Sequence, residues 1–147
     1  MTKIDASALN ELSRLEGQAI AVEDFNEGGD ALQALAKLDK ARAQAVALRI
    51  LREQIGDVYY QAGAFDVLYG VSAPDAVRYM EEAASIVDPY ILGAMLTEIA
   101  VDSGYIEHQA IVAKAVPILR RALACRSMEE LGAIEASIKH FDETYPA

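Results

Sequence analysis

The hydrophobic positions of this chain recur at intervals of three and four residues along most of its length. This is the period of an amphipathic α-helix, whereas the apolar–polar alternation of a β-strand never holds for more than a few positions. The first predicted helix covers about residues 7–24. Its apolar stripe consists of Leu9, Leu12, Leu15, Ala19 and Val22. The pattern therefore predicts an all-α protein.

The longest predicted helix covers about residues 31–62 and follows a break at Asn26–Gly29, with Asp30 as its N-cap. A helix of this length would extend about 48 Å at 1.5 Å per residue. One of its faces carries Ala31, Leu35, Leu38, Ala41, Ala45, Leu48, Ile55 and Tyr59. Gly56 and Gly63 would weaken its second half, because glycine is unfavourable in a helix interior, and a kink or break near either glycine is an open alternative. We expect a bundle or an orthogonal array of about six helices around this long helix.

The remaining predicted helices cover about residues 72–87, 88–102, 105–126 and 127–143. Ser72 and Asp88 each precede a proline-containing helix start. Ser127 and Glu130 have the spacing of a capping box, which starts the last predicted helix. Pro117 predicts a kink inside the helix of residues 105–126. Capping residues and prolines thus determine the predicted helix boundaries in the second half of the chain.

The composition does not change along the chain in a way that separates two domains, so the sequence predicts a single domain of residues 1–147. The predicted core contains Leu12, Leu35, Leu48, Ile55, Val58, Ile91, Leu96, Ile99, Ile111, Leu119, Leu123, Leu131 and Ile134. Cys125 is the only cysteine and is expected in the same core as a small apolar residue.

Charge follows the chain in alternating blocks, and the largest block is acidic. Residues 53–113 contain ten carboxylates, six tyrosines and a single basic residue, Arg78, so this segment has a net charge of −9 in a chain of −10. A pI near 4.6 argues against direct binding to nucleic acid and against docking on anionic lipid, since both need a basic footprint. A basic protein partner is compatible with it.

Two interpretations account for the blocks. Basic residues gather in 37–52 and 114–126, between acidic segments. In the first interpretation, neighbouring helices of opposite charge favour one topology, although each exposed pair contributes only about 0–1 kcal/mol. In the second, the acidic segment forms a face that binds a partner. The first interpretation is favoured for the blocks as a whole.

The stretch Ile55–Tyr59, followed by Gly63 and Phe65, resembles the first helix of a tetratricopeptide repeat. In that resemblance Gly56 would allow a close approach of helices and Gly63 would make the turn. The match covers about 15 residues, and no period of about 34 residues continues it. Pro74 also interrupts the expected second helix. We therefore interpret the stretch as a helical hairpin.

The tyrosines give the leading functional hypothesis. Tyr59 and Tyr60 are adjacent, so on a helix they point about 100° apart and at least one should lie outside the apolar stripe. Exposed tyrosines beside carboxylates are typical anchors of protein interfaces. The predicted partner-binding residues are Glu53, Asp57, Tyr59, Tyr60, Asp66 and Tyr69. The sequence thus favours a non-enzymatic interaction module, an adaptor, regulator or inhibitor, that binds a basic protein through an acidic, tyrosine-bearing face.

Two alternatives stay open. One is a ligand-binding, metal-binding or catalytic bundle that uses Glu98, Asp102, Glu107 and His108. The other is a subunit that forms a homo-oligomer through its Ala- and Leu-rich helix faces. The sequence lacks Glu-x-x-His, His-Glu-x-x-His and phosphate-binding glycine motifs, so no catalytic residue, metal ligand or cofactor is predicted.

The expected location is cytoplasmic. The lone cysteine excludes an internal disulfide, and the chain has no pattern of a signal peptide. Apolar runs are interrupted by charges well before the roughly 20 residues that a membrane span needs. We expect a protein that does not insert into a membrane.

Overall fold

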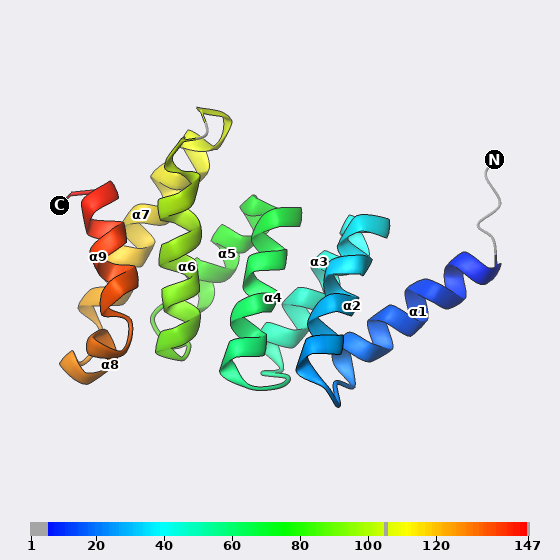
Figure 1. The fold of residues 1–147 in the computed structure, drawn as a ribbon. Coiled ribbons are helices and arrows are strands. Elements are labelled where there is room, and N and C mark those ends of the chain that lie inside the picture. The colour runs from blue at the N-terminus through cyan, green and yellow to red at the C-terminus, as the bar shows by residue number, and fades with distance from the viewer. Residues whose placement is uncertain (1–5, 105, 147) are drawn as a thin grey trace. The chain divides into compact units, whose positions relative to one another are not determined.

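The computed structural model describes residues 6–104 and 106–146, and within them every regular element is a helix (Figure 1). This confirms the predicted all-α fold. None of the described helices is long and apolar enough to cross a lipid bilayer. The described residues up to Val71 form one compact unit, the N-terminal unit, and those from Ser72 form a second, the C-terminal unit. The single domain of residues 1–147 stays a prediction.

Four helices build the N-terminal unit: α1 (Ala6–Ile20), α2 (Phe25–Leu38), α3 (Lys40–Arg52) and α4 (Val58–Val71). Each helix packs on the next along the chain, and α4 also packs on α2. The buried side chains of this unit include Leu15, Ala19, Leu32, Leu35, Ala43, Val46, Ile50, Leu51, Phe65 and Leu68. The core of this unit thus lies between helices that are in contact with one another.

The long helix predicted over residues 31–62 is wrong, because two breaks divide this stretch among α2, α3 and α4. At the first break Asp39 is extended, and its carboxylate accepts a hydrogen bond of 3.0 Å from the backbone N–H of Arg42, which caps α3. At the second break Gln54 and Gly56 have φ values of 53° and 78°. A left-handed backbone ends a right-handed helix.

The start of α2 also differs from the prediction. Asp24, not Asp30, is its N-cap, and the Asp24 carboxylate accepts hydrogen bonds from the backbone N–H groups of Asn26 (2.9 Å) and Glu27 (3.1 Å). Asp24 therefore satisfies two of the amide donors that a helix start leaves unpaired. The predicted break at Asn26–Gly29 consequently lies inside α2, and both of its glycines are helical.

The two glycines of α2 provide a matched pair for a stability measurement. A Cβ at Gly28 would lie 2.6 Å from Val22 Cγ2 and 2.9 Å from the Tyr60 hydroxyl, whereas a Cβ at Gly29 has no atom within 4 Å. We expect Gly28→Ala to lower the free energy of unfolding by about 1–3 kcal/mol through overpacking. Gly29→Ala should raise it by about 0.5–1 kcal/mol through helix propensity. Urea denaturation measures both, and equal effects would contradict the close contact at Gly28.

The C-terminal unit consists of α5 (Ala73–Ala83), α6 (Pro89–Val101), α7 (Gln109–Ala124), α8 (Met128–Ala133) and α9 (Glu135–Thr144), with short 3₁₀ turns η1 (Asp102–Gly104) and η2 (Ile106–His108) between α6 and α7. Helix α5 packs on α7, and α6 contacts α7, α8 and α9. Its buried side chains include Ala76, Val77, Met80, Leu92, Met95, Leu96, Ile99, Leu119, Ile134 and Phe141.

Two predicted helix starts in this unit are confirmed. Asp88 accepts a hydrogen bond of 2.9 Å from the backbone N–H of Tyr90, and Ser127 and Glu130 form the reciprocal capping box. The last predicted helix, however, is divided at Ile134, whose backbone (φ −125°, ψ 29°) leaves the helical region. The Ile134 side chain is buried against Gly93, where an added Cβ would lie 3.0 Å from Ile134 Cγ2. Glycine at that position lets the chain around Ile134 approach α6 closely.

Two further starts are only partly as expected. Helix α5 begins after Ser72, but the Ser72 hydroxyl donates to the Asp75 carboxylate (2.8 Å) and does not cap the backbone. The helix predicted from residue 105 begins as α7 at Gln109, after the 3₁₀ turn η2, and Pro117 lies inside it.

Burial divides the predicted core into two groups. Leu35, Ile91, Leu96, Ile99, Leu119 and Ile134 are buried as expected. Leu12, Leu48, Ile55, Val58, Ile111, Leu123 and Leu131 are only half-buried. The prediction for Cys125 is wrong, because this residue is the C-cap of α7 and its side chain is exposed. Positions on the edge of an apolar stripe are covered only where a neighbouring helix reaches them.

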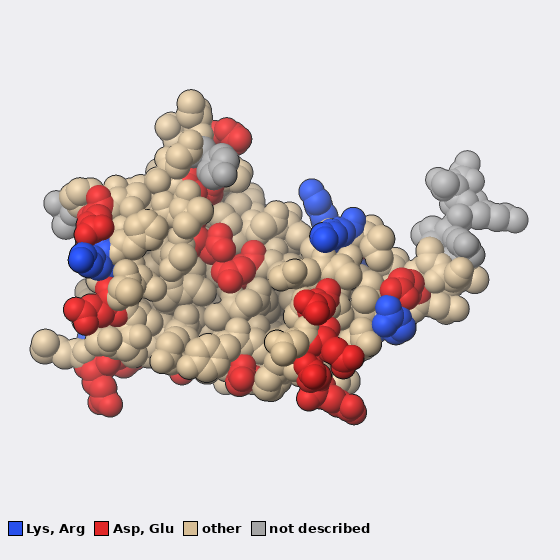
Figure 2. Space-filling model, in the orientation of Figure 1, with Lys and Arg blue, Asp and Glu red and all other residues tan. Residues whose placement is uncertain are grey.

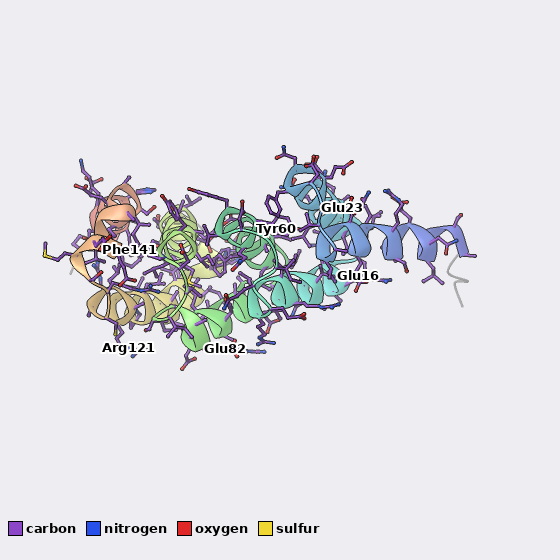
Figure 3. All side chains as sticks on the ribbon, turned by 90° about the horizontal axis from the view of Figure 1, so that it is seen from below. Glu16, Glu23, Tyr60, Glu82, Arg121 and Phe141 are labelled. Carbon is purple, nitrogen blue, oxygen red and sulfur yellow. The ribbon has the colours of Figure 1, made fainter. Side chains whose placement is uncertain are left out.

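Ion pairs connect the basic blocks with the acidic ones. These pairs are Arg42–Glu16, Arg49–Glu53, Arg120–Asp142 and Arg126–Glu130. Arg42 Nε lies 2.6 Å from Glu16 Oε2 and joins α3 to α1, with Glu16 labelled in Figure 3. Arg42–Glu16 and Arg120–Asp142 join different helices, which agrees with the interpretation that opposite charges favour one topology, whereas the other two pairs are local (i, i+4).

Candidate partner-binding site

The predicted partner-binding residues lie at the end of α3, in the loop that follows and in α4. Glu53, Asp57, Tyr59 and Asp66 are exposed, whereas Tyr60 and Tyr69 are buried. Tyr59 keeps 63% of its surface exposed and Tyr60 only 7%, so the neighbouring tyrosines point to different sides as expected. Tyr60 and Tyr69 therefore serve the core and are not anchors on an open face. Contacts between helices bury these two rings, although both lie close to carboxylates in the sequence.

The Tyr60 side chain connects α4 with α1 and α2. Its hydroxyl donates a hydrogen bond of 2.6 Å to the carbonyl oxygen of Ala19, and its ring stacks on Phe25 with centroids 5.5 Å apart. Figure 3 shows Tyr60 lying between α4 and α2. Burial raises the pKa of the Tyr60 phenol above its ordinary value of 10.0, because the phenolate would lose its hydration. Tyr60 thus fixes the spacing of α2 and α4.

The loop before α4 is held by polar contacts. Asp57 Oδ1 accepts a hydrogen bond of 2.8 Å from the Tyr60 N–H and so caps α4. The buried Gln61 side chain donates to the Gly56 carbonyl oxygen at 3.1 Å. Gly56 lies outside the helix, and Gly63, which was expected to make a turn, lies inside α4. The turn predicted by the tetratricopeptide resemblance is therefore wrong.

A groove of about 250 Å³ separates the exposed sides of α2 and α4, and we call it the α2–α4 groove. The buried side chains of Leu32, Tyr60 and Ala64 line it, together with the partly exposed aromatic rings of Phe25 and Tyr59. Asn26, Gln33 and Asp57 add polar atoms. The groove thus combines an apolar interior with hydrogen-bonding groups, as interface pockets do.

Two helical glycines face this groove, one from each helix. Gly29 of α2 and Gly63 of α4 both line it, and a Cβ at either would have no atom within 4 Å. Packing therefore does not require glycine at these positions, although each costs about 1 kcal/mol relative to alanine in a helix. A larger side chain at either position would occupy the groove. The glycines keep it open.

Carboxylates gather at the start of α2, where Glu23, Asp24 and Glu27 line a separate hollow together with Arg14. Glu23, Asp24, Glu27 and Asp30 are all exposed, and Figure 2 shows a concentration of acidic side chains over this part of α2. Asp57 adds a carboxylate from the groove itself. The local field therefore attracts cations and basic side chains.

Sequence reasoning identified Asp57, Tyr59 and Tyr60 but missed the contribution of α2. Phe25 and Gly29 lay in a stretch that was predicted to be a break. The order Asp24–Phe25 was an available signal, because an aspartate directly before an apolar residue is typical of a helix start. With α2 begun at Phe25, the two glycines fall on a helix.

The alternative site is assembled only in part. His108 Nδ1 lies 2.8 and 2.9 Å from the two carboxylate oxygens of Asp102, which is buried, whereas the His108 side chain is 42% exposed. Burial, followed by the charge of Asp102, raises the pKa of the nearby Tyr145 phenol. The Asp102 carboxylate orients the imidazole and connects the end of α6 to the start of α7.

The other two residues of that alternative do not complete a metal site. Glu98 is half-buried one turn before Asp102, and Glu107 is exposed beside His108. Across residues 6–104 and 106–146, no three His, Cys, Asp or Glu side chains lie close enough to hold a metal ion. What the described residues of this region show is a histidine oriented by the Asp102 carboxylate.

Models of known protein families, curated proteins and solved structures were compared with the chain, and none of them matches it.

Proposed function

We propose that the chain is a non-enzymatic, acidic helical module that binds a basic segment of a partner protein in the α2–α4 groove. The observation that carries the proposal is the groove itself. Three sequence-predicted residues, Asp57, Tyr59 and Tyr60, line it together with the exposed ring of Phe25. Aromatic residues are enriched in protein interfaces, and the rings of Tyr59 and Phe25 are the ones that remain exposed at this groove.

The size of the groove favours a partner side chain over a free small molecule. Pockets for drug-sized ligands have volumes of about 300–1,000 Å³ and enclose most of the ligand. The α2–α4 groove has about 250 Å³. It accommodates one large apolar side chain, and the Asp57 carboxylate that lines it attracts a lysine or arginine residue of the same segment. A segment with an aromatic or large aliphatic residue between basic residues has the matching chemistry.

The experiment is a peptide selection followed by binding to defined variants. A random peptide library is selected against the purified chain, and an enriched peptide is labelled for fluorescence anisotropy. We expect enrichment of lysine or arginine around an aromatic or large aliphatic residue. Gly63→Leu, which fills the groove from α4, should weaken binding about tenfold or more.

Gly70→Leu is the matched control. Gly70 also lies in α4 with no atom within 4 Å of its Cβ position, but it does not line the groove. We expect Gly70→Leu to leave the affinity for the peptide unchanged. Higher salt should reduce the affinity of the unmodified chain for the peptide, because salt screens exposed charges. Equal affinities of the Gly63→Leu and Gly70→Leu proteins would show that the groove is not the binding site.

The proposal includes a cellular location and leaves the oligomeric state to be measured. A cytoplasmic location is compatible with a lone, exposed cysteine at the end of α7. Self-association into a homo-oligomer stays an alternative, and the mass of the chain in solution at several concentrations tests it.

A further inference from the structure

A second apolar groove lies in the C-terminal unit, along α8 and α9, and we call it the α8–α9 groove. Its volume is about 650 Å³, and it is open to solvent. Positions 128 and 131 of α8 and positions 135, 138 and 142 of α9 line it, and within each helix they have the three- or four-residue spacing of one helix face. The two sets belong to separate helices that are divided at Ile134, and together they form one stripe along the groove, with Met128, Leu131 and Ile138 as its apolar members. The face has the geometry of a helix-binding surface.

One apolar residue of this stripe, Met128, is almost fully exposed. Met128 retains 89% of its surface, the largest exposed fraction among the exposed large hydrophobic residues. Leu131 and Ile138 are half-buried, and Gly132 between them leaves open space where a Cβ would stand. Methionine is flexible and polarisable, so it suits surfaces that bind apolar side chains of varied shape.

The charged residues around the stripe indicate the net charge that a partner should carry. Glu135, Asp142 and Glu143 line the groove with a single cation, Lys139. The Asp142 carboxylate is already paired with Arg120, whereas the carboxylates of Glu135 and Glu143 form no ion pair within residues 6–104 and 106–146. The segment from residue 129 to residue 147 has a net charge of −4. A basic partner gains favourable interactions here, and an acidic one does not.

We infer that the α8–α9 groove binds a basic amphipathic helix of a partner protein. Apolar residues of that helix, spaced by three and four, would contact Met128, Leu131 and Ile138. Its lysine or arginine residues would lie beside Glu135 and Glu143. This is the helix-in-groove mode of recognition, in which apolar anchors provide affinity and flanking charges provide specificity. The inference does not depend on the α2–α4 groove, because all its residues belong to the C-terminal unit.

The probe is a synthetic helical peptide with leucines spaced by three and four and lysines on both flanks, labelled for fluorescence anisotropy. A second peptide replaces every lysine by glutamate. We expect the lysine peptide to bind the full chain and the glutamate peptide to bind at least about tenfold more weakly. The lysine peptide should also bind the Gly63→Leu protein normally, which separates this site from the α2–α4 groove.

Met128→Glu and Ile86→Glu form the decisive pair of variants. Both residues are exposed in the C-terminal unit, at 89% and 81%, but only Met128 lines the groove. Each variant adds a carboxylate, which by itself would attract the lysine peptide more strongly. A loss of affinity of about tenfold in Met128→Glu alone therefore reports the lost apolar contact. For the charges, Glu143→Lys should weaken binding and Glu129→Lys, outside the groove, should weaken it less.

Four outcomes would overturn the inference. They are failure of the lysine peptide to bind, equal binding of the two peptides, equal effects of Met128→Glu and Ile86→Glu, and loss of lysine-peptide binding in Gly63→Leu. Sedimentation of the chain alone tests the competing occupant. A dimer that dissociates in Met128→Glu would assign this groove to a second copy of the chain.

Discussion

Replacing Tyr60 by alanine is expected to lower the free energy of unfolding by about 3–5 kcal/mol, the usual cost of removing a buried aromatic ring. The ring is 7% exposed and stacks on Phe25. Its hydroxyl also satisfies the Ala19 carbonyl oxygen at 2.6 Å. Removing the side chain leaves a cavity between α2 and α4 and an unpaired backbone acceptor. Urea denaturation followed by circular dichroism measures the loss.

Two substitutions separate the parts of this effect. Tyr60→Phe keeps the ring and should cost about 1–2 kcal/mol for the lost hydrogen bond. Tyr59→Ala removes an exposed ring and should change stability by less than about 0.5 kcal/mol. If Tyr59→Ala and Tyr60→Ala cost the same, the burial of Tyr60 described above is wrong.

Alkaline pH gives a second readout of Tyr60. Its pKa is raised in the folded chain by burial, so the folded state binds the phenolic proton more tightly than the unfolded state. This contribution to stability is fully present below the ordinary tyrosine pKa of 10.0 and is lost as pH rises through the higher folded value. Stability should therefore fall as pH rises from 10.0 toward the folded pKa, and less steeply in Tyr60→Phe. An unchanged slope in Tyr60→Phe would exclude Tyr60 as the titrating group.

The helical class and the caps at Asp88 and Ser127 could be predicted because they depend on neighbouring residues alone. The break at Asp39 could not, whereas Gly56 indicated the break beside Gln54. Asp39 is a polar residue that a continuous amphipathic helix also carries on its exposed side, so the apolar period passes over it unchanged. Periodicity identifies a helix more securely than it locates where the helix ends.

The candidate site was predictable to the same extent. The acid and the tyrosines of the α4 side were identified from sequence, because exposed aromatic and charged residues of this kind are frequent in interfaces. The wall supplied by Phe25 and Gly29 depends on α2 lying beside α4, which is a tertiary contact. The burial of Tyr69 has the same origin, since a single helix does not determine which of its faces a neighbour covers. The pairing of Asp102 with His108 likewise depends on the two 3₁₀ turns between α6 and α7.

Phe141 has in the C-terminal unit the structural role that Tyr60 has in the N-terminal unit. Its side chain is fully buried, and the Arg120 guanidinium lies 4.7 Å from its ring centroid. The Tyr145 ring packs beside it with centroids 5.6 Å apart, and the Tyr145 hydroxyl donates to the Ile99 carbonyl oxygen at 2.9 Å. Phe141 therefore holds α9 against α6 and α7, and it is labelled in Figure 3.

Phe141→Ala should lower the free energy of unfolding by about 3–5 kcal/mol, because it opens a cavity and removes the aromatic surface beneath the Arg120 cation. Met128→Ala in the adjacent α8 is the control and should change stability by less than about 0.5 kcal/mol, since Met128 is exposed. Phe141→Leu, which retains much of the apolar volume, should fall between them. Urea denaturation of the three variants tests this order. A loss below about 1 kcal/mol in Phe141→Ala would mean that α9 is not anchored through this ring, and the α8–α9 groove would then lack the rigid face that helix binding requires.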